Sequence, residues 1–340
     1  MQTPDMTGLI EHLALRYSSL GRPLDLAPLT LDFQASNNLF EYSTTGGRFV
    51  LKVVVHPEAL YGNHTVVERL EAVGRATFEL RRAGLPVEEI VASDEARFVQ
   101  QYNGRLLRLF AFNAGRAYDD RRCERLRSAR ALRRLHTEGL ACLSDGTRRG
   151  IARIEKAFPL HFTAGKLPAL RMFLQEQDGA GGVLEQILAQ WGVIEAAVER
   201  TLTYRRVWAD SVCLVHTDFH PRNALFADEQ EQVTLIDLDN MIIDWRLPCL
   251  GFSILRFGLF QRERTSEALH EAIATFAGEE FGQPGFLDDL LHAMIYVEIE
   301  KVLRILYRVK TTGQYAGFID NVCPLHLSNI KFLTESAVCA

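Results

Sequence analysis

Cysteine is scarce in this sequence of 340 residues. Six cysteines occur at irregular spacing, and none belongs to a C-x-x-C pair: Cys123, Cys142, Cys213, Cys249, Cys323 and Cys339. This spacing argues against a zinc site and against a disulfide framework. Free thiols in a reducing compartment are the simpler interpretation, so we expect a cytoplasmic protein.

The sequence also lacks targeting and membrane signals. The segment Met1–Gly8 has neither a basic n-region nor an apolar h-region, which argues against a signal peptide. No apolar run approaches the length of a membrane span. With 47% hydrophobic residues, 24% charged residues and a net charge of −5, the composition gives no reason to expect a nucleic-acid or membrane partner. Internal repeats are absent, and the oligomeric state cannot be read from this pattern.

Residues 1–112 carry the pattern of an antiparallel sheet with one long inserted helix. Strands are expected at residues 39–43, 48–55, 97–101 and 105–112, and helices at residues 7–20 and 65–83. The turn signals Gly46-Gly47 and Asn103-Gly104 join these strands into hairpins. Gly84 stands where a helix is expected to end.

After residue 112 the pattern becomes mainly helical. Helices are expected at residues 123–136, 183–209 and 287–310, and short strands at residues 212–215 and 233–236. A chain of this length exceeds the usual size of one core. We therefore expect an α+β protein with an N-terminal lobe (residues 1–112) and a C-terminal lobe (residues 113–340).

The two short strands of the second part each end in polar residues. His216-x-Asp218 is followed by Asn223, and Asp237 follows the next strand, with Asp239 beside it. This order resembles the kinase signature H-R-D-x-x-x-x-N followed by a metal-binding aspartate. Asp218, with His216 at the start of the motif, is the candidate catalytic residue, acting as a base on an acceptor hydroxyl.

Asn223 and Asp237 offer the hard oxygen ligands that Mg²⁺ prefers, so we expect them to bind the metal. The alternative is that Asp218 and His220 cap turns and that the Asn223 side chain forms hydrogen bonds with the backbone of the loop. The flanking pattern of apolar strand, polar loop, apolar strand and acidic pair favours the catalytic interpretation.

Lys52 lies in the apolar strand Phe49-Val50-Leu51 and is costly to bury unless it is paired. In kinases a lysine on the third strand contacts the nucleotide phosphates and pairs with a helix glutamate. Glu71 is the first candidate for that partner and Glu68 the second. The alternative is a lysine that snorkels to an exposed strand end.

Taken in order, these segments resemble the aminoglycoside phosphotransferase and choline kinase superfamily, the small-molecule branch of the protein-kinase-like fold. The family's catalytic loop commonly reads H-G-D-x-H-P-x-N, and the segment His216–Asn223 reads HTDFHPRN. The pair His220-Pro221 is a mark of the small-molecule branch. Further matching segments are Asn38-Leu39-Phe40, Phe49-Val50-Leu51-Lys52-Val53, Gly84-Leu85-Pro86-Val87 and Leu135-His136. The resemblance covers residues 30–310.

Two positions depart from the family pattern. Thr217 replaces the usual glycine of the catalytic loop, where it has less conformational freedom. Gly251 stands where a second aspartate, which generally braces that loop, is expected. There is also no G-x-G-x-x-G loop, which this family often lacks.

The resemblance implies a bilobal protein-kinase-like fold that uses ATP, or another nucleoside triphosphate, with Mg²⁺. Residues 1–112 would then form the nucleotide-binding lobe, and residues 113–340 the catalytic and acceptor-binding lobe. The adenine is expected at the linker Phe112-Asn113-Ala114-Gly115, with Phe110 and Phe112 as candidate walls. The alternative for both rings is a place in the strand core, which we favour for at least one of them.

The acceptor is expected to be a small molecule with a hydroxyl group, such as an aminoglycoside, an amino alcohol, a sugar or homoserine. Glu298 and Glu300 are candidates to bind an amine, although acidic residues on a helix are usually solvated. A stress-response type of Ser/Thr protein kinase remains an alternative, because residues 104–116 resemble those enzymes. A nucleotide-binding pseudokinase is the third alternative.

Overall fold

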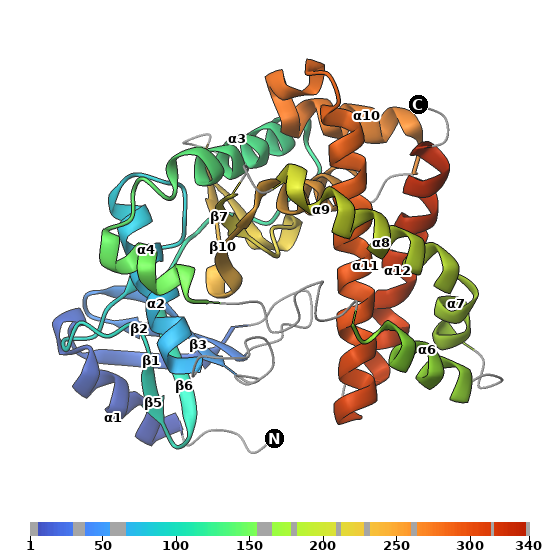
Figure 1. Ribbon diagram of the computed structural model, residues 1–340. Coiled ribbons are helices and arrows are strands. Elements are labelled where there is room, and N and C mark those ends of the chain that lie inside the picture. The colour runs from blue at the N-terminus through green and yellow to red at the C-terminus, as the bar shows by residue number, and fades with distance from the viewer. Residues whose placement is uncertain are drawn as a thin grey trace. The chain divides into compact units, whose positions relative to one another are not determined.

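The computed structural model describes residues 6–29, 38–54, 66–154, 165–177, 182–208, 212–227, 232–259, 264–313 and 316–337 (Figure 1). By their internal contacts the residues form two compact units. Unit 1 consists of Met1–Tyr118, Arg134–Ala157 and Arg222–Ile243, and unit 2 of Asp119–Arg133, Phe158–Pro221 and Asp244–Ala340. Each unit therefore combines distant parts of the sequence.

Unit 1 contains an antiparallel sheet in the order β1-β2-β3-β6-β4, with β5 paired to β6. Its strands are β1 (Pro23–Pro28), β2 (Asn38–Thr44), β3 (Gly47–Val54), β4 (Ile90–Val91), β5 (Gln100–Tyr102) and β6 (Arg105–Ala111). Thr44 pairs with Gly47, and Tyr102 pairs with Arg105, so both predicted hairpins are confirmed. The sequence did not predict β1, because prolines stand at both of its ends and are tolerated mainly in edge strands such as this one.

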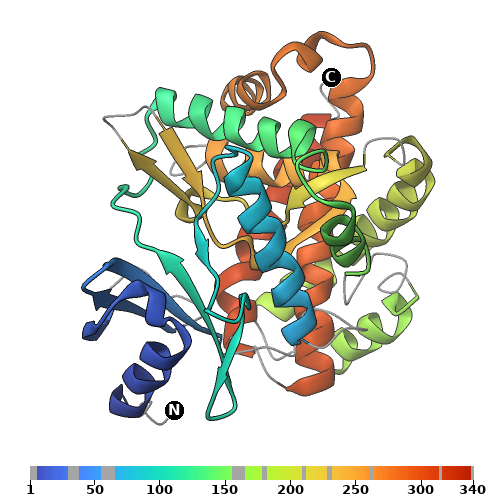
Figure 2. The same cartoon turned by 90° about the vertical axis from the view of Figure 1, so that its left-hand side faces the viewer.

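Two helices of unit 1 cover its sheet. Leu9 and Leu13 of α1 (Met6–Arg16) join the core cluster that contains Leu51 of β3. Leu70 of α2 (Val66–Arg82) packs with Val99 and Leu106 instead. Figure 2 shows α1 as the dark-blue helix and α2 as the light-blue helix. Because neighbouring residues of a strand point to opposite faces, Leu51 and Lys52 lie on different sides of the sheet.

The predicted end of α2 is confirmed. Gly84 has a positive φ of 81°, a conformation that glycine adopts without steric cost. The N–H of Leu85 donates to the carbonyl oxygen of Leu80 at 3.0 Å, which satisfies an end carbonyl of the helix.

A second, smaller hairpin belongs to unit 1. It pairs β8 (Ala224–Ala227) with β9 (Gln232–Leu235) and is connected to the segment before β4. Leu235 donates its N–H to the Pro86 carbonyl at 2.7 Å and accepts from the Glu88 N–H at 2.8 Å. Unit 1 also contains α4 (Asp145–Ala152), η1 (Ser18–Leu20) and η4 (Leu238–Asn240).

Unit 2 is mainly helical. Its elements are α6 (Leu167–Glu176), α7 (Val183–Ala189), α8 (Trp191–Trp208), β7 (Val212–His216), α9 (Arg246–Gly258), α10 (Ser266–Ala277), η5 (Gly278–Gly282), α11 (Phe286–Thr312) and α12 (Ala316–Ala337). Three elements include residues of both units: α3 (Arg122–Glu138), η3 (Pro221–Asn223) and β10 (Met241–Trp245). The long helix α11 lies beside α12, and α9 packs against α11 (Figure 1).

The predicted helix at 287–310 is confirmed as α11, whereas the predicted helix at 183–209 is two helices that meet at Gln190. The sequence did not predict α9, because it is buried on nearly all sides and so has no polar stripe. Within the described ranges, no helix is both long enough and apolar enough for a membrane span.

Candidate active site

Lys52 is the central cation of unit 1. It lies on the interior strand β3, and only 6% of its surface is exposed. Its Nζ is 2.5 Å from Asp237 Oδ1 and 2.7 Å from Asp239 Oδ2. Lys52 is therefore a buried and paired lysine, and the alternative of a snorkelling side chain does not apply.

Arg108 shares a counter-ion with Lys52. The two residues are directly opposite each other in the β3–β6 register, and Arg108 is 1% exposed. Arg108 Nη1 contacts Asp239 Oδ1, and Arg69 of α2 donates to the Asp239 carbonyl oxygen at 3.2 Å. Burial lowers the pKa of Arg108 to about 10. Asp239, to which the sequence assigned no role, is therefore the acidic residue on which three cations converge.

Glu71 is not the partner of Lys52 in the structure. Its carboxylate accepts hydrogen bonds from the N–H groups of Phe98 and Val99, at 3.2 Å and 3.0 Å, and lies 3.2 Å from Arg97 Nε. Glu68, the second candidate, is exposed on α2. The counter-charges come instead from residues after β9, and no local sequence pattern indicates a contact across 185 positions.

Glu88 is a further acidic group near Lys52, and it was not predicted from the sequence. It is half-buried and accepts a hydrogen bond from the Leu238 N–H at 3.2 Å. Burial raises its pKa and the charge of Asp237 acts in the same direction, while Lys52 and Arg108 oppose the rise. The balance leaves the pKa of Glu88 above its ordinary value.

Asn223 and Asp237 are brought to the same end of the β8–β9 hairpin. Ala224 pairs with Leu235, so the residues just outside this pair are Asn223 and Ile236. The Ile236 N–H donates to the Asn223 carbonyl at 3.0 Å, and Asp237 follows directly. Strand pairing thus brings together Asn223 and Asp237, which are 14 positions apart in the sequence.

Asp237 has a left-handed backbone, with φ 60° and ψ 49°. This conformation costs a non-glycine residue roughly 1 kcal/mol or more, and such residues cluster at functional sites. Its side chain is 37% exposed, so one side of the carboxylate can still receive a ligand. With Asn223 it provides the oxygen donors that suit Mg²⁺.

The described residues contain no group of three or more His, Cys, Asp or Glu side chains placed to hold a metal ion. Mg²⁺ in nucleotide sites usually has one or two protein ligands and takes the rest from phosphates and water. The pair Asn223 and Asp237 fits such a site.

The linker Phe112–Gly115, where the adenine is predicted to bind, contains hydrogen bonds of its own. Asn113 accepts a bond from the Gly115 N–H at 2.8 Å and donates from Nδ2 to Thr234 Oγ1 at 3.0 Å. Arg48 Cζ lies 3.8 Å from the centroid of the Phe112 ring. Phe110 is 6% exposed and packs with Ile90 and Phe98, so it is a core residue. Of the two phenylalanines, Phe112 remains the candidate for a wall of the adenine site.

In unit 2, Asp218 follows strand β7 and is surrounded by basic groups. Its Oδ1 is 3.2 Å from Lys301 Nζ, and its Oδ2 is 3.7 Å from His220 Nε2. Its N–H donates to His216 Nδ1 at 3.3 Å. Burial alone would raise the pKa of Asp218, but Lys301, His220 and His216 hold it well below the ordinary value of 3.8. The carboxylate is therefore ionised at neutral pH.

His216 is fully buried, and its ring lies 5.7 Å from the ring of Phe219. Its carbonyl oxygen accepts a hydrogen bond from Cys249 Sγ at 3.3 Å. These contacts fix the start of the segment His216–Asn223 against Phe219 and helix α9.

The two departures from the family pattern are accommodated. Among the described non-glycine residues, only Ala96, Asn103, Asp120 and Asp237 have a positive φ, so Thr217 does not need one. Gly251 leaves space for α11, because a Cβ at this position would lie 2.8 Å from Met294 Cγ. Cys249, two residues earlier, provides a bond to the loop from α9.

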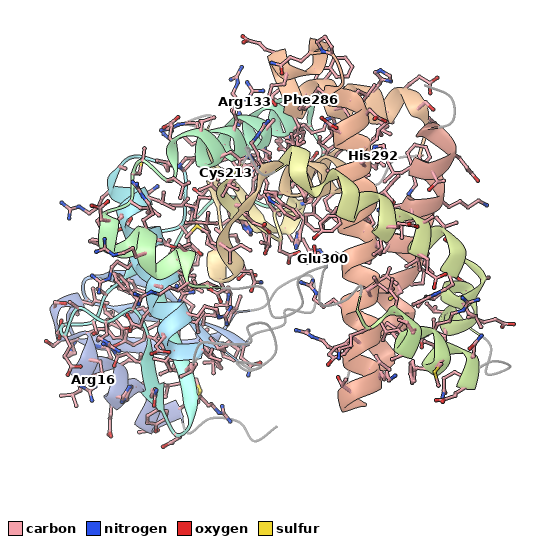
Figure 3. All side chains as sticks on the ribbon, in the orientation of Figure 1. Arg16, Arg133, Cys213, Phe286, His292 and Glu300 are labelled. Carbon is pink, nitrogen blue, oxygen red and sulfur yellow. The ribbon has the colours of Figure 1, made fainter. Side chains whose placement is uncertain are left out.

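Glu298 is not available to bind an amine. It is completely buried, and its carboxylate contacts Arg256, His326 and Asn329 at 3.1 Å, 2.8 Å and 2.9 Å. Glu300, which lies on α11 about two turns after His292 (Figure 3), is 7% exposed and also part of the interior. The sequence favoured solvent-exposed positions on a helix for both glutamates, and this expectation is wrong.

Residues 29–279 match the phosphotransferase enzyme family. No curated protein matches the sequence.

Solved structures of similar fold share little sequence identity with the chain. An amicoumacin kinase, hAmiN, in complex with AMP-PNP, Ca²⁺ and Ami has a TM-score of 0.64 at 14% identity, covering 96% of this chain and 93% of that one. The spectinomycin phosphotransferase APH(9)-Ia in complex with ADP and spectinomycin has a TM-score of 0.61 at 14% identity, covering 98% and 95%. The choline kinase LicA from Streptococcus pneumoniae has a TM-score of 0.56 at 15% identity, covering 97% and 98%.

These structures confirm the α+β protein-kinase-like fold. The family match covers most of the chain, so the protein belongs to the phosphotransferase enzyme family.

Proposed function

We propose that this enzyme transfers the γ-phosphate of ATP to a hydroxyl group of a small molecule, of aminoglycoside, amino-alcohol, sugar or homoserine type. The observation that carries the proposal is the ionised Asp218 carboxylate at the end of β7, within the HTDFHPRN loop. The solved relatives named for spectinomycin, amicoumacin and choline support a small-molecule acceptor.

In this reaction Asp218 accepts a hydrogen bond from the acceptor hydroxyl and orients its oxygen toward the γ-phosphorus. The new O–P bond forms as the bond from phosphorus to the β–γ bridging oxygen breaks, and ADP leaves. The hydroxyl proton passes to Asp218 and then to water. Because the transition state of phosphoryl transfer is loose, a carboxylate of low pKa is sufficient as base.

Lys52 is proposed to bind the α- and β-phosphates, and Asn223 and Asp237 to hold Mg²⁺. Bound Mg²⁺ would neutralise the charge that develops on the phosphate oxygens. Asp237 pairs with Lys52, so the two residues are already near each other before a ligand binds. The linker at Phe112 and Asn113 is proposed to bind the adenine.

The two other interpretations of the sequence are less well supported. A pseudokinase usually lacks one of the four residues Lys52, Asp218, Asn223 and Asp237, and all are present here. A protein acceptor is disfavoured by the small molecules named in the solved relatives. We propose a cytoplasmic location, because all cysteines in the described ranges are free thiols; Cys339 lies outside those ranges.

The test is phosphate transfer from γ-labelled ATP to a panel of hydroxyl-bearing metabolites, with protein substrates in parallel. Label in a metabolite is expected, and label in protein alone would favour the protein kinase. Binding of ATP without any transfer would favour the pseudokinase.

Asp218→Asn is the matched variant for the base. It keeps the size of the side chain and removes its charge, so transfer should be lost while ATP affinity stays within about threefold. Full turnover by Asp218→Asn would show that another group is the base.

A further inference from the structure

Lys301 is a lysine of α11 to which neither the family motifs nor the sequence pattern assigns a role. Its side chain is 16% exposed, and its Nζ lies 3.2 Å from Asp218 Oδ1. The same Nζ lies 4.7 Å from the centroid of the Phe252 ring of α9. The ammonium is thus held between an aromatic face and the carboxylate of the proposed base.

The location of Lys301 is unfavourable for a merely structural lysine. Burial lowers its pKa, and the neighbouring charge of Arg304 adds to this effect, while Asp218 opposes it. Within the described ranges, Asp218 is its single hydrogen-bond acceptor, although an ammonium has three N–H groups. A buried cation with one hydrogen bond stabilises a fold poorly, since desolvation can exceed the gain from pairing.

The geometry explains what the pair can do for Asp218. A carboxylate at the end of a loop can rotate about its side-chain bonds, and each rotation moves the oxygen that meets the acceptor hydroxyl. Lys301 binds Oδ1 from a long helix, whereas His220 lies 3.7 Å from Oδ2, beyond normal hydrogen-bond distance. The contact from the helix to Oδ1 therefore limits the rotation of the Asp218 carboxylate.

We propose that Lys301 is a positioning residue of the phosphotransferase reaction, which anchors the Asp218 carboxylate in the orientation that meets the acceptor hydroxyl. The proposal rests on the assignment of Asp218 as the base. It predicts that Lys301 matters for turnover and not for nucleotide binding, because its hydrogen bond is made to the proposed base.

The groups that face Asp218 also predict a change in pH dependence. They are Lys301 from α11 and His216 and His220 from the catalytic loop. Lys301 is the largest of the influences that lower the pKa of Asp218, so that pKa should rise when its charge is removed. The acidic limb of the profile of kcat/KM against pH should then move to higher pH.

The experiment compares Lys301→Met, Lys301→Arg and Lys331→Met in the full-length protein. Lys331 of α12 is 71% exposed, so the same substitution there controls for the loss of a lysine. Turnover is measured with an acceptor from the panel or, if none reacts, as ATP hydrolysis with water as acceptor. Affinity for ADP is measured by calorimetry.

We expect Lys301→Met to lower kcat by about 10²-fold, in the range of a misplaced acid–base group. Its affinity for ADP should stay within about twofold, and its acidic limb should move upward by about one pH unit. The kcat of Lys301→Arg should be at least about tenfold higher than that of Lys301→Met, because a guanidinium also pairs with a carboxylate. Lys331→Met should match the wild type.

A wild-type kcat and a wild-type acidic limb in Lys301→Met would overturn the proposal. Loss of activity without a shift of the limb, and without recovery in Lys301→Arg, would also overturn it, since a structural role predicts that result. If Lys301→Met does not fold, Lys301→Gln replaces it in the same comparison. Failure of the proposed function is a separate outcome, in which Asp218→Asn itself retains transfer.

Discussion

Lys52 and Arg108 are directly opposite each other on strands β3 and β6, and the carboxylate of Asp239 contacts both. Like charges at opposed positions of a sheet destabilise it, and burial increases the effect. The proposed phosphate-binding lysine is therefore tolerated in the sheet because a residue after β9 neutralises it.

Asp239→Asn should destabilise the fold strongly. It leaves Arg108 buried without a charged partner, and removal of one partner of a buried pair costs about 3–5 kcal/mol. Urea unfolding measures the change. The double variant Asp239→Asn with Arg108→Met should regain part of the loss, because Lys52 still pairs with Asp237. If the single variant unfolded within about 0.5 kcal/mol of wild type, Asp239 would not be the common counter-ion.

Lys52→Met should lower kcat/KM for ATP by about 10²-fold, the range found when one donor to a developing charge is removed. The protein should stay folded, because Arg108 and Asp239 still neutralise each other. Initial rates at varied ATP give the value, and thermal unfolding checks the fold. Unchanged kinetics would exclude the phosphate-binding role.

Asp237→Asn should raise the Mg²⁺ concentration required for half-maximal turnover by about tenfold or more, because a charged ligand is lost. Asn223→Ala should act in the same direction. The control is Asp25→Asn, which changes an exposed aspartate on edge strand β1. A Mg²⁺ dependence equal to that of the wild type in both variants would contradict the assignment of the ligands.

Gly251→Ala should cost about 1–3 kcal/mol, since the added methyl group meets Met294 between α9 and α11. Gly192→Ala is the matched control, because its Cβ would meet no atom within 4 Å and alanine favours the helix by about 1 kcal/mol. Chemical denaturation should therefore give opposite signs for the two variants. Equal effects would show that α9 and α11 are not closely packed at Gly251.

The low pKa of Asp218 predicts how stability depends on pH. Its folded value lies below the ordinary value of 3.8, so the ionised carboxylate stabilises the fold above about pH 4. This contribution is lost as the pH falls through the folded pKa. The difference in unfolding free energy between wild type and Asp218→Asn should therefore shrink below pH 4, and a difference that grew on acidification would contradict the assigned direction.

Local patterns in the sequence determined most of the sheet of unit 1. The turns Gly46-Gly47 and Asn103-Gly104 specified two hairpins, and Gly84 specified the end of α2. These elements were predictable because turn chemistry and helix capping act over a few residues. The order of His216, Asp218, Asn223 and Asp237 likewise predicted the family.

The partners of these residues were decided by the tertiary structure alone. Glu71 was the expected partner of Lys52, but the fold gives Lys52 the carboxylates of Asp237 and Asp239. Lys301 reaches Asp218 across 83 positions of sequence. Charge pairing depends on distance in space, which chain folding sets and residue spacing does not. The sequence by itself therefore determined which reactive side chains this protein carries. The packing of distant segments decided which residues pair with those side chains and position them.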